Sequence, residues 1–136
     1  MSDAILALRG AIQAHLAEDA ALAALIGPGR VHDEAPRAAR GVYVVHGDVE
    51  ARDWSTGSGA GCEQDVALLV WAGESSSSRQ ALEAAALIVS ALDDVDLSLA
   101  GHALINLRWQ SSRLARDARS GLAFVTIRFR AVTEPL

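Results

Sequence analysis

The segment CEQDVALLVWA, residues 62–72, decides the fold of this chain. Its apolar residues run without a polar break from Val66 to Ala72, and a strand that is apolar on both sides is typical of a central position in a sheet. The preceding segment GVYVVHGDVEA, residues 41–51, is rich in valine and also predicts a strand. Because the residues between them are polar and glycine-rich, we expect the two strands to pair as an antiparallel hairpin.

A second hairpin is predicted near the end of the chain. The segment LAFVTIRFRAVTE, residues 122–134, alternates between apolar and polar residues, which predicts a strand with Val125, Ile127 and Phe129 inward. In the strand before it, the same pattern predicts an inward face of Ile105, Leu107 and Trp109 and an outward face of Asn106, Arg108 and Gln110. We expect the segment RLARDARSG, residues 113–121, to form a charged turn between these strands.

Three helices are expected around these strands. The first begins after Ser2 or Asp3, either of which can cap it, and the second ends at Gly27 and Pro28. The third and longest begins at a capping box made by Ser77 and Gln80. Its expected apolar stripe consists of Leu82, Ala85, Val89 and Leu92. Short extended pieces are expected around Val31 and from Leu97 to Leu99.

This order of elements predicts one domain of residues 1–136 with an α+β fold. We expect an antiparallel sheet of about four main strands, with helices packed on one face. The length allows one sizeable core. The composition of 51% hydrophobic and 21% charged residues is that of a folded protein.

The charge and cysteine content narrow the possible functions. A net charge of −5 argues against general nucleic-acid binding, although a local arginine patch could still serve. Cys62 is the only cysteine, so no internal disulfide or multi-cysteine zinc site is possible, which fits a reducing compartment. We expect no signal peptide and no membrane span.

The glycine-rich loop Gly57-x-Gly59-x-Gly61 does not have the context of a phosphate site. A dinucleotide-binding loop leads from a strand into a helix, whereas a strand follows here. We therefore expect a mobile hairpin tip. Trp54 stands out in this polar tip, and two interpretations of it remain open. It is either an interface anchor or a side chain that folds back onto its own domain.

A metal or catalytic site is a weaker hypothesis. His46, Asp48 and Glu50 alternate, so a regular strand would place these donors on one face. A bulge at Gly47 would break that register, and we prefer a solvated strand end without metal. We expect the other histidines, which are His15, His32 and His102, to be surface residues. Cys62 has no elbow turn or helix N-terminus beside it, so we expect it to be inert.

Three arginines, Arg108, Arg128 and Arg130, are expected to share the outward face of two neighbouring strands. Glu63 and Asp65 are expected to pair with them. This face is either an ordinary solvated surface, on which ion pairs contribute about 0 to 1 kcal/mol, or a surface for a partner, because arginine is enriched at interfaces.

The chain resembles the tail terminator (tail completion) proteins of long-tailed bacteriophages, in the branch that also serves gene transfer agents. The matching segments are MSDAILALRGAI (1–12), GDVEARDWSTGSG (47–59), VALLVWA (66–72), LAGHALINLRWQSS (99–112) and FRAVTE (129–134). They occur in the order of the family and extend over nearly the whole chain, with the weakest match between Arg30 and Arg40.

The resemblance implies a structural virion protein rather than an enzyme. It implies an α+β subunit that forms a six-membered ring, caps the tail tube, stops its polymerisation and joins it to the head-side connector, while DNA passes through the hole. Assembly in the cytoplasm of a bacterial host is implied, with no catalytic residue, cofactor, metal or membrane. We expect the subunit contact to use Arg52, Asp53, Trp54, Ser55, Thr56 and Gly57 with Arg108, Arg128 and Arg130. The alternative hypotheses are a small ligand-binding or metal-dependent enzymatic α+β domain that uses His46, Asp48 and Glu50, and a regulatory nucleic-acid binder that uses the arginine face.

Overall fold

The computed structural model describes residues 3–37, 39–74 and 76–136, which form three helices and one six-stranded sheet. The helices are α1 (Ala4–Ala17), α2 (Ala20–Ile26) and α3 (Ser78–Leu92). The strands are β1 (Val31–His32), β2 (Tyr43–Asp53), β3 (Cys62–Trp71), β4 (Ser98–Leu99), β5 (His102–Arg116) and β6 (Ala123–Pro135). The α+β class expected from the sequence is confirmed.

The body of the sheet consists of four long strands in the order β2-β3-β6-β5, with the short β1 and β4 at its edges. The expected number of about four main strands therefore describes the long strands and omits the two short ones. The central position predicted for residues 62–72 is correct, because β3 lies between β2 and β6. One pairing differs from the expectation: β1 pairs with β2 in parallel, because the connection between them returns the chain to the end of the sheet where β1 began.

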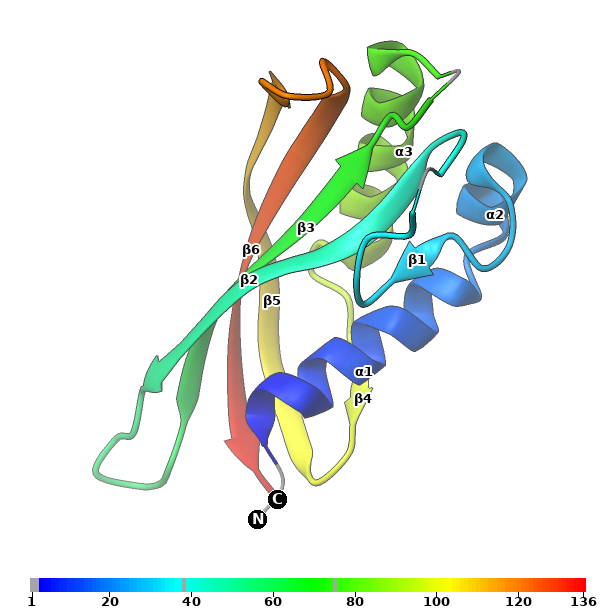
Figure 1. Cartoon of the computed structure of the whole chain (residues 1–136). Coiled ribbons are helices and arrows are strands. Elements are labelled where there is room, and N and C mark those ends of the chain that lie inside the picture. Colours follow the sequence, from blue (N-terminus) through cyan, green and yellow to red (C-terminus); the bar gives the residue numbers. More distant parts are fainter. Residues whose placement is uncertain (1–2, 38, 75) are drawn as a thin grey trace.

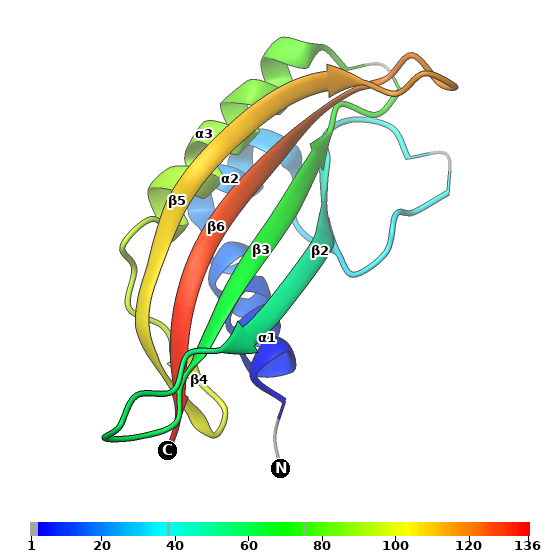
Figure 2. The same cartoon turned by 90° about the vertical axis from the view of Figure 1, so that its left-hand side faces the viewer.

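The helices cover one face of the curved sheet and leave the other face open (Figures 1 and 2). We call these the helix face and the open face. The core between the layers includes Leu8, Ile12 and Leu16 of α1, Ile88 of α3, Leu68 of β3 and Val125, Ile127 and Phe129 of β6. Each large apolar side chain buried here stabilises the fold by about 1.5–3 kcal/mol. Asp3 caps α1, and Ser77 with Gln80 forms the predicted capping box of α3; Ser2 lies outside the described residues.

Two predicted apolar stripes are corrected by the structure. In α3 the residues that reach the core are Ala81, Ala84, Ala85, Ile88 and Leu92, whereas Leu82 is 44% exposed. The alanines allow α3 to approach the sheet closely, so the buried stripe is rotated away from Leu82. In β5 only Leu107 of the expected inward face is buried. A bulge between Leu104 and Asn106 turns Ile105 outward, and Trp109 lies on an edge strand where helix cover is incomplete.

The charged turn is also shorter than predicted. β5 pairs with β6 as far as Arg116 and Ala123, and Asp117 closes the remaining turn by accepting hydrogen bonds from the backbone and hydroxyl of Ser120. β5 therefore carries Arg113 and Arg116 of this segment, and Arg119 stays in the turn.

We expect Gly73→Ala to lower the free energy of unfolding by about 2–4 kcal/mol. Gly73 joins β3 to α3 with φ +69°, and a Cβ atom there would lie 2.1 Å from the carbonyl oxygen of Gly41. Urea unfolding measures the change. Gly57→Ala is the matched control, because a Cβ atom there meets no described atom within 4 Å, and it should change stability by less than about 0.5 kcal/mol. Equal midpoints for the two variants would contradict this packing.

Candidate assembly surface

The β2–β3 hairpin curves away from the helices at one end of the sheet (Figure 1), and Trp54 begins its loop directly after β2. The backbone N–H of Trp54 donates to the carbonyl oxygen of Gly61 at 2.9 Å, and Thr56 and Gly59 exchange backbone hydrogen bonds. The carboxylate of Asp53 accepts from the backbone and hydroxyl of Ser55. The glycines thus form a closed hairpin turn and do not lead into a helix N-terminus.

Trp54 combines the two interpretations left open by the sequence. Its ring stacks over the guanidinium of Arg130 in the same subunit, with 5.2 Å between the guanidinium carbon and the ring centroid. The side chain nevertheless remains 48% exposed. Trp54, Arg130 and the 51% exposed Ile105 line one shallow groove on the open face. Trp54 is therefore held in position by its own domain while much of its apolar surface stays available.

Glu63 is the centre of an ionic network on the open face. It is buried, and its carboxylate accepts hydrogen bonds from Arg52 and from Arg130. Arg52 also pairs with Asp65 and with the exposed Glu50. The hydrogen bond from Arg52, followed by that from Arg130, lowers the pKa of Glu63 although burial opposes the shift. Hydrogen bonds to Asp65 and Glu63 raise the pKa of Arg52 in turn.

The predicted arginine face is only partly assembled. Arg108 and Arg130 are direct neighbours on β5 and β6, and Arg128 follows on the same face. Arg130 pairs with Glu63 as expected, but Arg52 is the arginine that holds Asp65. Arg108 reaches Asp93 at the end of α3 with 3.3 Å between Nε and Oδ1. The partners of Arg52 within the chain could not be predicted from its own segment, because they depend on the register between β2 and β3.

The donors of the hypothetical metal site are separated. The strand pairing is irregular between His46 and Val49, as the bulge at Gly47 predicts. His46 therefore faces the helices, where its Nε2 lies 2.9 Å from Oε1 of Gln13, whereas Asp48 and Glu50 are exposed. Burial, followed by the charge of Arg9, lowers the pKa of His46. In residues 3–37, 39–74 and 76–136, no group of three or more His, Cys, Asp or Glu side chains could hold a metal ion.

The expected surface position of the other histidines is wrong. His102 is buried, and His15 and His32 are half-buried. Each lies where two elements meet: the Nε2 atom of His15 is 3.0 Å from the carbonyl oxygen of Ala91, and His32 packs edge-on against Tyr43. Cys62 is a half-buried free thiol at the start of β3. None of the described helices is long and apolar enough to span a bilayer.

The chain matches the family model described as tail completion protein gp17 over residues 10–134. The chain belongs to this tail completion protein family. A chain from a solved structure titled "Virion of native gene transfer agent (GTA) particle" has 32% sequence identity to it and a TM-score of 0.86. The similarity covers 98% of this chain and 99% of that chain. No curated protein matches the chain significantly.

Membership of the tail completion family confirms the resemblance drawn from the sequence. The matched residues 10–134 include the whole β2–β3 hairpin, the network around Glu63 and both faces of the sheet. The surface described above is thus part of the family domain.

In this tail completion protein, we expect Glu63→Gln to lower stability near neutral pH and to weaken its dependence on acid. A carboxyl group whose pKa is lowered by folding contributes stability above its unfolded pKa of about 4.3. That contribution is lost as the pH falls through the lower folded pKa. Urea unfolding between about pH 6 and pH 3 should therefore show the difference between wild type and Glu63→Gln shrinking towards acid.

The matched control is Glu50→Gln, since Glu50 contacts the same Arg52 from a position where its side chain is 77% exposed. Its effect should be small at every pH. A difference between wild type and Glu63→Gln that stays constant with pH would contradict a lowered pKa at Glu63.

Proposed function

We propose that this tail completion protein is a structural subunit of a phage or gene transfer agent particle, where six copies form a ring at the head-side end of the tail tube. The ring caps the finished tube, ends its polymerisation and joins it to the head-side connector. Its partners are further copies of itself, the tail tube protein and the connector (stopper) protein. DNA passes through the hole without sequence recognition, and no step needs a catalytic residue or cofactor. Assembly takes place in the cytoplasm of the bacterial host.

One observation carries this proposal: the chain has the same fold, from end to end, as a protein from a gene transfer agent virion. Membership of the tail completion family supports the same role. Because both chains are covered almost completely, the similarity extends over all the helices and strands described above. The shape of the subunit is also suited to assembly, since the β2–β3 hairpin and the open face of the sheet are not covered by helices (Figure 2).

We place the contact between subunits on the hairpin residues Arg52, Asp53, Trp54, Ser55, Thr56 and Gly57 and on the arginine face of Arg108, Arg128 and Arg130. A ring requires a heterologous contact, in which one surface of each copy meets a different surface of the next. Trp54 is suited to be the anchor, because Arg130 positions its ring and leaves 48% of it exposed. Within this set Arg130 supports Trp54 from its own subunit, and Arg108 on β5 is the group that meets the next copy, whereas Arg128 lies on the open face of the central strand β6.

We expect Trp54→Ala to reduce particle assembly much more than Asp53→Ala. Burial of a tryptophan at an interface is typically worth about 2 kcal/mol or more, whereas an exposed ion pair contributes less than about 1 kcal/mol. The yield of joined particles measures the effect, and circular dichroism of the isolated subunits checks the fold. Leu6→Ala on α1, which also truncates an exposed apolar side chain, is the control. Normal assembly of Trp54→Ala, or an unfolded subunit, would show that Trp54 is not the anchor.

Removal of the protein tests the function itself. We expect a producing strain without it to accumulate tail tubes of abnormal length and heads that are not joined to tails, both visible by electron microscopy. Restoring the wild-type chain from a plasmid should restore joined particles. Joined particles with normal tails in the deletion strain would exclude the proposed function.

A further inference from the structure

The two long edges of the sheet are only partly covered within the subunit. On one side β1 pairs only with residues 44–45 of β2. On the other side β4 pairs only with residues 102–103 of β5, and Asp93 and Asp94 cover the edge as far as Trp109. In the described part of the chain, no strand lies beyond residues 48–53 of β2 or residues 110–116 of β5. Such uncovered edges are templates for pairing with another chain.

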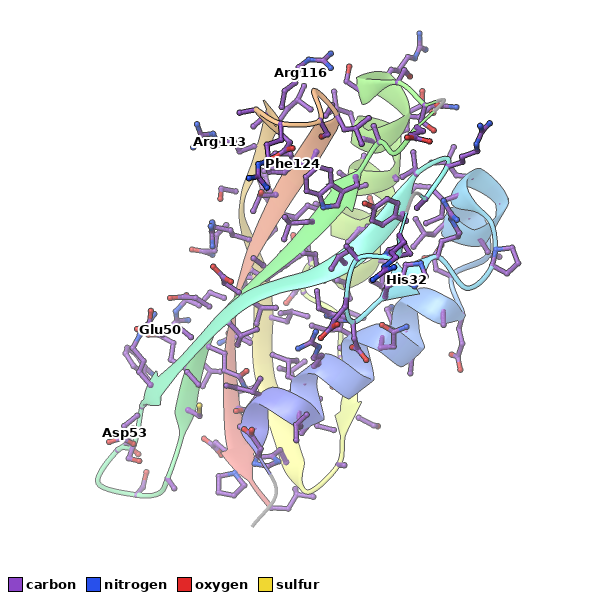
Figure 3. The ribbon with its side chains drawn as sticks, in the orientation of Figure 1. His32, Glu50, Asp53, Arg113, Arg116 and Phe124 are labelled. Atoms are coloured by element: carbon purple, nitrogen blue, oxygen red, sulfur yellow. The ribbon has the colours of Figure 1, made fainter. Side chains whose placement is uncertain are left out.

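The two uncovered edges carry opposite charges. The β2 edge carries Asp48, Glu50 and Asp53, and the one arginine among them, Arg52, is neutralised by Glu63 and Asp65. The β5 edge carries Arg113 and Arg116, which lie towards the far end of the sheet from Glu50 and Asp53 (Figure 3). Two copies of the same edge would repel each other, since like charges opposite one another destabilise strand pairs. Only the acidic edge of one copy and the basic edge of another are compatible.

The strand register indicates how far the two edges are offset. Glu50 on β2 lies level with Arg108 on β5, because Glu50 pairs with Asp65, Asp65 pairs with Arg130 and Arg130 pairs with Arg108. Arg113 pairs with Thr126, four positions from Arg130 along β6, so it lies about 14 Å further along the strands. Stepping from β2 of one copy, through β5, β6 and β3 of the next copy, to the β2 of that copy crosses four strand spacings, or about 19 Å.

These two lengths correspond to a strand tilt of about 36°, which lies within the 35–45° of closed barrels. This offset tilts the strands around the ring axis. When the open face points towards the axis and the helices lie outside, the tilt has the right-handed sense that strand twist imposes. Six copies would then enclose a sheet about 45 Å across, which leaves room for a DNA duplex.

We propose that neighbouring copies of this chain join edge to edge, with residues 48–53 of β2 pairing antiparallel to residues 110–115 of β5 in the next copy. Glu50 then lies opposite Arg113 on the open face, and Asp48 lies opposite Ala115, one position from Arg116 along the strand. The same register brings the Trp54 hairpin alongside Arg108 of the next copy. This inference rests on the proposed ring and specifies the contact that closes it.

Charge reversal tests the pairing in assembling particles. We expect Glu50→Arg alone and Arg113→Glu alone each to lower the yield of joined particles at least about tenfold, because the unfavourable contact recurs around the whole ring. The double variant Glu50→Arg/Arg113→Glu restores opposite charges and should recover the yield to within about threefold of wild type. Arg79→Glu on α3, whose partner is Glu83 of the same helix, should assemble normally.

A cysteine pair tests the same contact without changing the charge balance between subunits. In a Cys62→Ser background, Glu50→Cys with Arg113→Cys should give covalent multimers of up to six copies when assembled particles are oxidised, and neither single cysteine should. Near-normal yields for both single reversals, failure of the double reversal to recover, or absence of multimers would overturn edge pairing. The proposed function would survive such a result if the deletion strain makes joined particles only when the wild-type chain is restored.

Discussion

The antiparallel pairing of β3 with β6 is the interaction on which the rest of the molecule depends. It continues without a bulge from Cys62 opposite Thr133 to Trp71 opposite Phe124, and the helix-face side chains of both strands are almost completely buried. Both strands are central, and β2 and β5 pair directly with them. The register between β3 and β6 therefore determines which residues of β2 and β5 lie level with each other. The same register places Glu63 where Arg130 can reach it and carries the opposite charges of β2 and β5 to the two edges of the sheet.

Much of this fold could be predicted from the sequence, because its central strands and helices follow local patterns. The alternation in β6 predicted the burial of Val125, Ile127 and Phe129 correctly, and the capping box at Ser77 marked the start of α3. The errors lie where tertiary context outweighs the pattern. A bulge in β5 turned Ile105 outward, and contacts between elements enclosed His102. Local patterns also could not show the assembly surface. Arg52 was expected in a subunit contact, but its partners within the chain depend on pairing between strands.

The asymmetry of the two layers connects the fold to assembly. Helices bury one face of the sheet, so the stability of the subunit does not require the open face or the far ends of the edge strands. Those parts carry two features that are unfavourable in an isolated subunit. They are a half-exposed tryptophan, which leaves apolar surface in water, and long uncovered strand edges of unlike charge, which can pair with other chains. Unlike edges disfavour a symmetric dimer and favour a heterologous contact, which is the contact that a ring needs. The same charges reduce unwanted pairing of free subunits, because each edge repels its own kind.

A cryo-EM reconstruction of the particle neck, at a resolution that traces strands, tests the central claim most directly. The account predicts six copies of this chain in one ring between tail tube and head-side connector, with a continuous sheet that passes from β2 of each copy to β5 of the next. Glu50 should lie opposite Arg113, the open face should surround the hole, and the helices should lie outside. A ring whose copies meet through their helices, or a neck that lacks this chain, would contradict it.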